Sequence, residues 1–255
     1  MSKIIAIIQV RLDSSRFPKK ALSQLIDKPM IIHVIDRAKQ SKHIDQLVVA
    51  TSTRKIDDPI IDVVSKQGIS VFRGSADDVL DRYYKAAKKY HADIIVRITG
   101  DCPLIDPVII DKVIQCYIDG KYDYVSNTID QTYPDGLDTE VFSYKALEKT
   151  WKEAKLLSER EHVTPYIVNH PEKFKLINVR NDVDLSHMRW TVDYEKDLEY
   201  VKEIYGRLYK KDSIFLMDDI LQLLEKNPEL NKINIGITRN EGYLRSLDKD
   251  KIIKK

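Results

Sequence analysis

Short apolar runs alternate with segments of helical periodicity along the first half of the chain. Strands are predicted where an apolar run is continuous, and helices where apolar residues recur every three or four positions. The expected strands lie at 4–8, 46–51, 69–72, 93–99 and 123–126, and the expected helices at 29–39, 59–66, 75–90 and around 109–117. Alternating strands and helices of this kind predict an α/β fold, with a mixed, mostly parallel sheet and helices on both faces.

The pattern changes after Asn127. Residues 128–180 combine a turn at 133–136, a strand at 137–142, a helix at 146–155 and another strand at 175–179. We interpret about 128–180 as a small α+β insertion that faces the substrate or contacts a second subunit. The core is expected to resume with a strand at 188–192 and helices at 195–208 and 218–226, before a frayed, lysine-rich end at 249–255. A chain of 255 residues then suits a single domain, 1–255, that carries this insertion.

Composition narrows the partners of the protein. The 42 Lys and Arg residues nearly balance the 40 Asp and Glu residues, for a net charge of +2. With no strong overall field, neither nucleic acid nor a membrane surface is an expected partner, and any anion must be bound locally. The apolar run at the N-terminus is short and continues into charged sequence, as in a strand rather than a signal peptide. Cys102 and Cys116 lack disulfide or metal-ligand spacing, which favours a cytoplasmic protein.

The first predicted strand leads into a loop rich in cations. Arg11, Arg16, Lys19 and Lys20 lie close together there, with Ser14 among them. Guanidinium and ammonium groups bind phosphate oxygens, and backbone N–H groups after a strand can hold an anion. Ligands of parallel α/β sheets bind beyond the carboxyl ends of the strands. The loop is therefore interpreted as a phosphate-binding loop, with a solvated basic turn as the alternative.

Two aspartates follow predicted strands at other points of the chain. Asp101 comes directly after Thr99 and Gly100, and the glycine lets a ligand approach the backbone; Asp193 follows the strand at 188–192. A few carboxylates facing phosphate oxygens are the ligands that Mg²⁺ prefers. The alternatives are a turn-forming role for Asp101 and a helix N-cap role for Asp193.

Four further polar residues are candidates for holding a second substrate. Asp138 and Glu140 are two residues apart on a predicted strand and should therefore face the same side. Burying two carboxylates in a core is costly, so we expect both to face solvent, polyol hydroxyls or a second cation. Arg160 and His162 would project to one side of an extended segment and donate to an anionic or hydroxylated ligand; a plain charged loop is the alternative. Arg97, inside a strand, needs a partner such as a core carboxylate.

Several of these stretches resemble a known family. Gln9-Val-Arg-Leu-Asp-Ser-Ser-Arg-Phe-Pro-Lys-Lys resembles the signature loop of the cytidylyltransferases that activate acidic sugars. Segments 72–83, 97–104, 133–140, 160–166 and 189–193 resemble the spore-coat polysaccharide biosynthesis branch, so that the likeness covers residues 3–200. It implies a Rossmann-like nucleotidyltransferase fold, CTP as the donor, dependence on Mg²⁺ and a homodimer.

The resemblance also assigns roles to residues. It places Arg11, Ser14, Arg16 and Lys20 in the nucleotide loop and Asp101 and Asp193 at the metal. Relatives usually carry glycine at the position of Lys19 and often a small residue at that of Asp13. The loop is therefore expected either to bind with an altered geometry or to turn Asp13 away from the triphosphate.

The expected reaction is in-line attack by an acceptor oxygen on the α-phosphorus of CTP, which releases pyrophosphate and leaves a CMP-activated, acidic sugar. The catalytic residues would be Arg16, Lys20 and Asp101, and the remaining nucleotide contacts Gln9, Arg11, Ser14, Arg73, Thr99 and Gly100. A small anionic or polyhydroxylated acceptor would be held by Asp138, Glu140, Arg160 and His162. The alternatives are a phosphorylated polyol or phosphonate as acceptor, another nucleotide as donor, or a nucleotide-binding protein without turnover.

Overall fold

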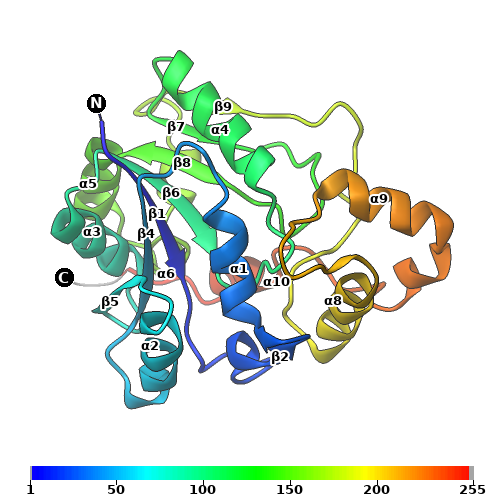
Figure 1. The fold of residues 1–255 in the computed structure, drawn as a ribbon. Coiled ribbons are helices and arrows are strands. Elements are labelled where there is room, and N and C mark those ends of the chain that lie inside the picture. The colour runs from blue at the N-terminus through cyan, green and yellow to red at the C-terminus, as the bar shows by residue number, and fades with distance from the viewer. Residues whose placement is uncertain (1, 253–255) are drawn as a thin grey trace.

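The computed structural model describes residues 2–252, which form one seven-stranded sheet with helices on both faces (Figure 1). The strand order is β5-β4-β1-β6-β8-β7-β9. The neighbours β5, β4, β1 and β6 are parallel, β8 is antiparallel to β6 and to β7, and β9 is parallel to β7. The predicted mixed, mostly parallel sheet is confirmed. The bounds are β1 Ile4–Gln9, β4 Gln46–Ser52, β5 Ser70–Gly74, β6 Ile94–Thr99, β7 Tyr124–Ser126, β8 Glu140–Ser143 and β9 Leu176–Asn178.

Alternate residues of β1 divide the core into two layers. Ile4, Ala6 and Ile8 pack with α1, α2 and α4 on one face, and Ile5 and Ile7 pack with α3 and α5 on the other. A strand buried on both faces reads as a continuous apolar run, which is why β1 lacks polar alternation. The helices are α1 Met30–Ala38, α2 Asp58–Ser65, α3 Val79–Tyr90, α4 Pro107–Asp119 and α5 Tyr144–Glu153.

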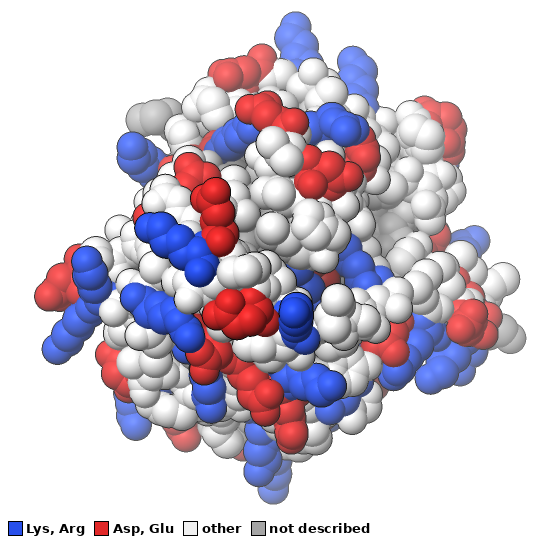
Figure 2. Space-filling model, turned by 90° about the vertical axis from the view of Figure 1, so that its right-hand side faces the viewer, with Lys and Arg blue, Asp and Glu red and all other residues white. Residues whose placement is uncertain are grey.

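A third apolar cluster joins the sheet to a helical layer at its side. Trp190 and Val192 are fully buried there against α8 Glu195–Leu208 and α9 Met217–Lys226. Short elements complete this part of the chain: η1 Lys20–Leu22, β2 Gln24–Leu25, β3 Lys28–Pro29, η2 Lys55–Asp57 and η3 Pro228–Lys232. On the face of the molecule that carries α8 and α9, acidic and basic residues are intermingled, as the balanced composition predicts (Figure 2). Among the described residues, no helix combines the length and apolar character needed to cross a membrane.

Three predicted elements differ from the structure. The segment 188–192 is not a strand: it makes one isolated bridge, Asp135 to Arg189, because its apolar side chains are buried against helices rather than in the sheet. The helix predicted to begin at Ser75 begins at Val79, because Asp78 accepts the hydrogen bond from Asp81 N and forms the N-cap. The strand predicted from residue 137 begins only at Glu140, which leaves Asp138 outside it.

Residues 128–180, predicted to be an insertion, and the C-terminal end pack closely against the rest of the chain. Strands β8 and β9 belong to the main sheet, and the segment expected to be extended around residue 160 is a helix, α6 Leu157–His162, followed by α7 Pro165–Val168. A further helix, α10 Glu241–Leu247, was not predicted. Residues 249–252, expected to be frayed, contact α6: Leu157 N donates to the carbonyl of Lys251 over 3.1 Å. The rest of that predicted frayed end, 253–255, lies outside the described residues.

Candidate active site

A cavity of about 740 Å³ opens at the carboxyl ends of β1 and β6. The loop after β1 and the loop after β6 form one side, and the insertion, with α6 and α7, forms another. Residues 240–249, which include α10, line the cavity as well, and Figure 1 shows α10 near the ends of the central strands. Most of the site residues predicted from the sequence line this cavity: Gln9, Arg11, Ser14, Arg16, Lys20, Thr99, Gly100, Asp101, Asp138, Glu140, His162 and Asp193.

Lys20 lies at the centre of the cationic loop, and the two predicted metal ligands converge on it. Its Nζ donates to Asp101 Oδ2 over 2.9 Å, to Asp193 Oδ1 over 2.8 Å and to the carbonyl of Val192 over 2.6 Å. Burial would lower the pKa of Lys20, but Asp101 and Asp193 together raise it above its ordinary value. Burial opposes ionisation of Asp101 too, yet Lys20 and Thr99 hold its pKa at about 2. Both partners are therefore charged at neutral pH.

The backbone of the loop explains its two unusual residues. Lys19 has a φ of 61°, in the left-handed region that glycine adopts at no steric cost, and its N–H donates to the carbonyl of Leu12 over 2.9 Å. Asp13 does not stand unpaired beside the phosphate site, because Arg54 Nη1 binds its Oδ2 at 2.7 Å and Arg11 Nε approaches its Oδ1 at 3.3 Å. The loop keeps the glycine-like geometry, at some backbone strain, and neutralises the extra acid.

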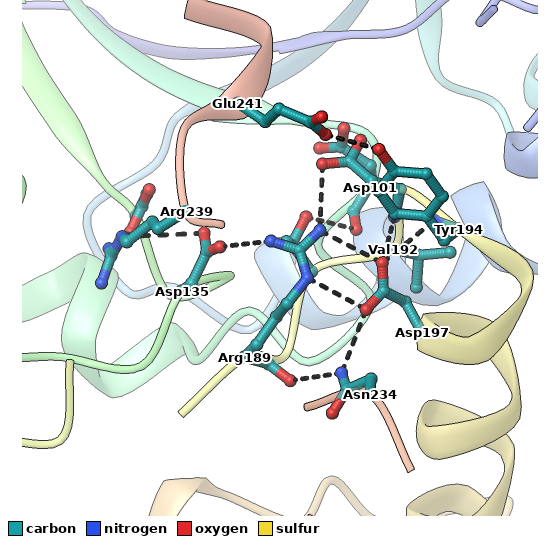
Figure 3. A network of polar contacts seen from close by, with 12 residues as sticks. Asp101, Asp135, Arg189, Val192, Tyr194, Asp197, Asn234, Arg239 and Glu241 are labelled. Atoms are coloured by element: carbon teal, nitrogen blue, oxygen red, sulfur yellow. Dashed lines mark hydrogen bonds and ion pairs between the residues drawn. The ribbon is translucent and has the colours of Figure 1, made fainter. Parts of the chain in front are cut away.

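Asp193 is held in place by Arg189. The guanidinium contacts Asp135 at 2.8 Å, Asp193 at 3.1 Å and the fully buried Asp197 at 3.0 Å (Figure 3). Asp197 in turn accepts from the backbone N–H groups of Asp193 and Tyr194 over 2.9 and 3.0 Å. The N-cap of α8 is Tyr194 rather than Asp193. The N-cap alternative for Asp193 is therefore wrong, and its carboxylate is directed to Lys20 and Arg16.

The pair Asp138 and Glu140 differs from its prediction. Glu140 does not face solvent: it is buried and forms an ion pair with Arg97, and Tyr124 donates to its second oxygen over 2.8 Å. The cost of burying this carboxylate is offset by Arg97, whose need for a core carboxylate was predicted. Asp138 binds Arg239 Nη2 at 2.7 Å, a residue of the C-terminal end.

Two predicted binding residues lie outside the cavity lining. Arg160 is buried, with its guanidinium on Asp78 at 2.5 Å and on the carbonyl of Trp151 at 2.8 Å, because α6 directs it toward the start of α3. Arg73 donates to the carbonyl of Ser52 over 3.0 Å and pairs with Asp58 at 2.8 Å. Both arginines contact other parts of the protein and neither lines the cavity, so their binding roles stay predictions.

His162 lies in the cavity wall but does not act as a cation. Its Nε2 is 3.0 Å from Ser246 Oγ, and burial is the main cause that lowers its pKa to about 4. A neutral imidazole exchanges hydrogen bonds with hydroxyl groups rather than pairing with an anion.

Gly100 lies where a side chain would not fit. A Cβ at this position would be 2.9 Å from the carbonyl oxygen of Gln9 and 2.9 Å from Val10 Cβ.

Sequence reasoning missed Arg82. Its side chain is 1% exposed and lines the cavity one helical turn after Val79, and within residues 2–252 it forms no ion pair, although Asp57 and Asp13 lie near enough to favour its charged form. Nη1 donates to the carbonyl of Ser75 over 3.0 Å and Nε has no partner among the described residues. Burial lowers the pKa of Arg82 to about 10. An arginine on the apolar stripe of a predicted helix was the signal that could have found it.

The donors around Lys20 fit a divalent cation that arrives with a nucleotide. Asp101 and Asp193 present hard carboxylate oxygens to one point, which suits Mg²⁺. Within the described part of the chain, no group of three or more His, Cys, Asp or Glu is arranged to hold a metal ion by itself. Phosphate oxygens and water would therefore complete the coordination.

The Rossmann-like sheet, the cationic loop after its first strand and the two aspartates beyond its carboxyl edge agree with what the resemblance to cytidylyltransferases implies. The sequence profile of the cytidylyltransferases matches residues 5–232, and the chain belongs to the cytidylyltransferase family. The match ends at residue 232, further along the chain than the predicted resemblance, which ended at residue 200. It does not include α10, which lines the cavity.

Similarity to individual proteins extends over nearly the whole chain. Protein MJ1063 of Methanocaldococcus jannaschii is 40% identical over 94% of this chain and 98% of its own. The spore coat polysaccharide biosynthesis protein SpsF of Bacillus subtilis is 33% identical over 90% of this chain and 97% of its own. The structure of a cytidylyltransferase from Leptospira borgpetersenii superposes with a TM-score of 0.88 at 36% identity, covering 93% of this chain and all of that one.

Proposed function

We propose that the protein transfers the cytidylyl group of CTP to an oxygen of a small polyhydroxylated acceptor, giving a CMP-activated sugar and pyrophosphate. The observation that carries the proposal is the position of Lys20, buried between Asp101 and Asp193 at the end of the cationic loop. Family membership supports CTP as the donor. The similarity to SpsF, whose name refers to polysaccharide biosynthesis, supports a sugar as the acceptor.

The chain supplies positioning and charge for this reaction. The acceptor oxygen forms a bond to the α-phosphorus while the bond to the bridging oxygen of the β-phosphate breaks, and Arg16 and Lys20 neutralise the charge that builds up on the departing pyrophosphate. Asp101 and Asp193 would hold Mg²⁺, which when bound supplies Lewis-acid stabilisation and lowers the pKa of the attacking hydroxyl. The proton of the attacking hydroxyl would pass to solvent water, since no described side chain stands out as a dedicated general base.

The acceptor would occupy the wall formed by the insertion. Thr128, Asp138 and His162 line it, and Arg97 and Arg239 are already paired with carboxylates. Burial, followed by the charge of Asp138, raises the pKa of Asp135 to about 7 despite two arginine neighbours. This end of the cavity therefore offers acceptors and neutral groups, which suit hydroxyl-bearing substrates, and residues 128–180 would be its substrate-facing insertion.

The test is a pyrophosphate-release screen of the four nucleoside triphosphates against acidic sugars, sugar phosphates, phosphorylated polyols and phosphonates. Turnover is expected with CTP and a hydroxylated sugar, and Asp101→Asn serves as the inactive control. Turnover with ATP or GTP but not with CTP would refute cytidylyl transfer. Turnover only with a phosphonate or a phosphorylated polyol would keep the reaction and change the acceptor class.

Replacing Arg82 by methionine is expected to raise the KM for CTP by roughly tenfold while leaving the free energy of unfolding equal or higher. A buried cation without a carboxylate partner is costly in the free protein, and the nucleotide would relieve that cost. One lost charge-assisted hydrogen bond contributes about 1.5–3 kcal/mol, and the lower end of that range gives an effect of this size. Steady-state kinetics and chemical denaturation measure the two quantities.

Arg37→Met is the matched control for Arg82→Met. Arg37 is equally buried, but its guanidinium donates to the carbonyls of Ile105 and Phe215 over 2.7 and 2.8 Å, and it does not line the cavity. That variant should lose stability and keep its KM for CTP. An unchanged KM in Arg82→Met would show that Arg82 serves only to hold the loop at Ser75.

A further inference from the structure

The segment 239–252, here called the C-terminal segment, covers one side of the cavity. Asp250 anchors its far end by accepting from Ser158 N over 2.8 Å and from Ser158 Oγ over 2.7 Å. In its middle, Ser246 Oγ donates to Glu161 over 2.9 Å and contacts His162. The family profile stops at residue 232, so this covering is not part of what the family match describes.

Glu241, in the first turn of α10, reaches the phosphate loop. Its Oε2 is 3.3 Å from Arg16 Nη1 and accepts from Tyr194 Oη over 2.5 Å, and its Oε1 pairs with Arg245 at 2.5 Å. Figure 3 shows Glu241 and Tyr194 meeting beside Asp101. The second arm of Arg16 pairs with Asp193 at 2.6 Å. Both arms of the guanidinium are therefore occupied by carboxylates.

A triphosphate can bind Arg16 only if one of the two carboxylates on its guanidinium moves away. Phosphate oxygens on Arg16 would lie beside the Glu241 carboxylate, and like charges a few ångströms apart in a partly buried site repel strongly. Arg16 has two arms, and Asp193 is fixed by Arg189 and Lys20 as well. Glu241 has no comparable support from the core, so it is the carboxylate that gives way.

The packing of α10 permits this movement. Its large apolar residues Leu244 and Leu247 are 47% and 42% exposed, and Ser246 is its only residue classed as buried among the described ones. Apart from the edge-to-face contact of Tyr243 with His162, the helix is therefore held on the cavity by polar contacts, which exchange with water at small net cost. Gly236 and Asn240, with φ values of 85° and 57°, precede it.

We propose that Glu241 holds the place of a nucleotide phosphate on Arg16, and that binding of the phosphate releases α10 from the cavity. This inference rests on the proposed function only through the phosphate-binding role of the loop. In the free protein the C-terminal segment covers the site and keeps Arg16 neutralised. Once phosphate has replaced Glu241, the acceptor side of the cavity opens.

Inorganic tripolyphosphate tests the exchange, because it has the charge of the nucleotide chain and no cytidylyl group to transfer. Titration calorimetry should show that Glu241→Gln binds it roughly three- to tenfold more tightly than the wild-type protein, as expected for removal of one nearby like charge. Asp248→Asn removes an exposed carboxylate from the end of the same helix and should bind like wild type. Equal or weaker binding by Glu241→Gln would overturn the inference.

Hydrogen exchange of the backbone amides at 241–250 tests the release. Exchange should accelerate when tripolyphosphate binds the wild-type protein, and it should already be faster in free Glu241→Gln. Slower exchange on binding would mean that the segment closes rather than opens, and would refute the inference. If Glu241→Gln binds tripolyphosphate more tightly but the wild-type protein transfers no cytidylyl group, only the proposed function is refuted. If the wild-type protein transfers the group but Glu241→Gln binds tripolyphosphate as the wild type does, only the exchange of Glu241 for phosphate is refuted.

Discussion

Lys20→Met should reduce the rate of pyrophosphate release from CTP by roughly a hundred- to a thousandfold, the usual effect of removing one preorganised group that stabilises transition-state charge. Within residues 2–252, Lys20 is the residue of the cationic loop that hydrogen-bonds to both Asp101 and Asp193. Methionine keeps most of the apolar side chain and removes the charge with its three hydrogen bonds. The rate is measured with saturating CTP, after circular dichroism has shown that the variant is folded.

Lys19→Met is the neighbouring control. Lys19 lies in the same loop, but its exposed side chain does not line the cavity, and its substitution should change the rate by no more than a few-fold. Asp101→Asn tests the same site independently, since it leaves Lys20 in place and removes the charge of a predicted metal ligand. Near-normal turnover in either Lys20→Met or Asp101→Asn would contradict the assignment of this cavity as the active site.

Glu140→Gln should lower the free energy of unfolding by about 3–5 kcal/mol, the cost of leaving a buried charge without its partner. Arg97 lies in the central strand β6, and its pairing with Glu140 crosses to β8. Although burial disfavours the charged guanidinium, the adjacent Glu140 raises the pKa of Arg97, so the cation persists at any accessible pH. The variant therefore leaves the Arg97 guanidinium, which stays charged in proteins, in the sheet without its ion-pair partner.

Denaturant unfolding measures this effect, and Glu203→Gln is its control. Glu203 pairs with Arg207 one turn away on the surface of α8, where an ion pair contributes about 0–1 kcal/mol. If Glu140 instead faced solvent, as its spacing in the sequence suggested, both variants would unfold alike. The comparison thus decides between a structural and a solvent-facing carboxylate.

Much of the fold could be predicted because local patterns encode local structure. The run 4–8 and the helix 195–208 were expected at or near their observed bounds, since burial on both faces or on one stripe dictates which positions are apolar. The cationic loop and the two aspartates were expected to lie near one another, because in an α/β sheet residues that follow strands gather at one edge. All three contribute to the same cavity.

The predictions that were wrong or incomplete concern residues whose structure depends on distant parts of the chain. The apolar segment 188–192 looked like a strand, but apolar character does not say whether the burying partner is a strand or a helix. Arg160 looked like a ligand contact, but α6 turns it to Asp78, which lies 82 residues earlier. Segment 239–252 carries no strong apolar pattern because α10 is held by polar contacts, and so nothing in its periodicity announced it.

Local patterns were enough to predict the strands and helices of residues 4–126, the cationic loop and the carboxylates available for a metal, since these depend on neighbours within a few residues. Which charges meet depends instead on how distant elements pack. Lys20 finds Asp101 at a separation of 81 residues and Asp193 at 173, and Arg16 finds Glu241 at 225. The sequence has more arginines and carboxylates than the site can use, and each pair is selected by the packing that brings its two elements together and excludes water from between them.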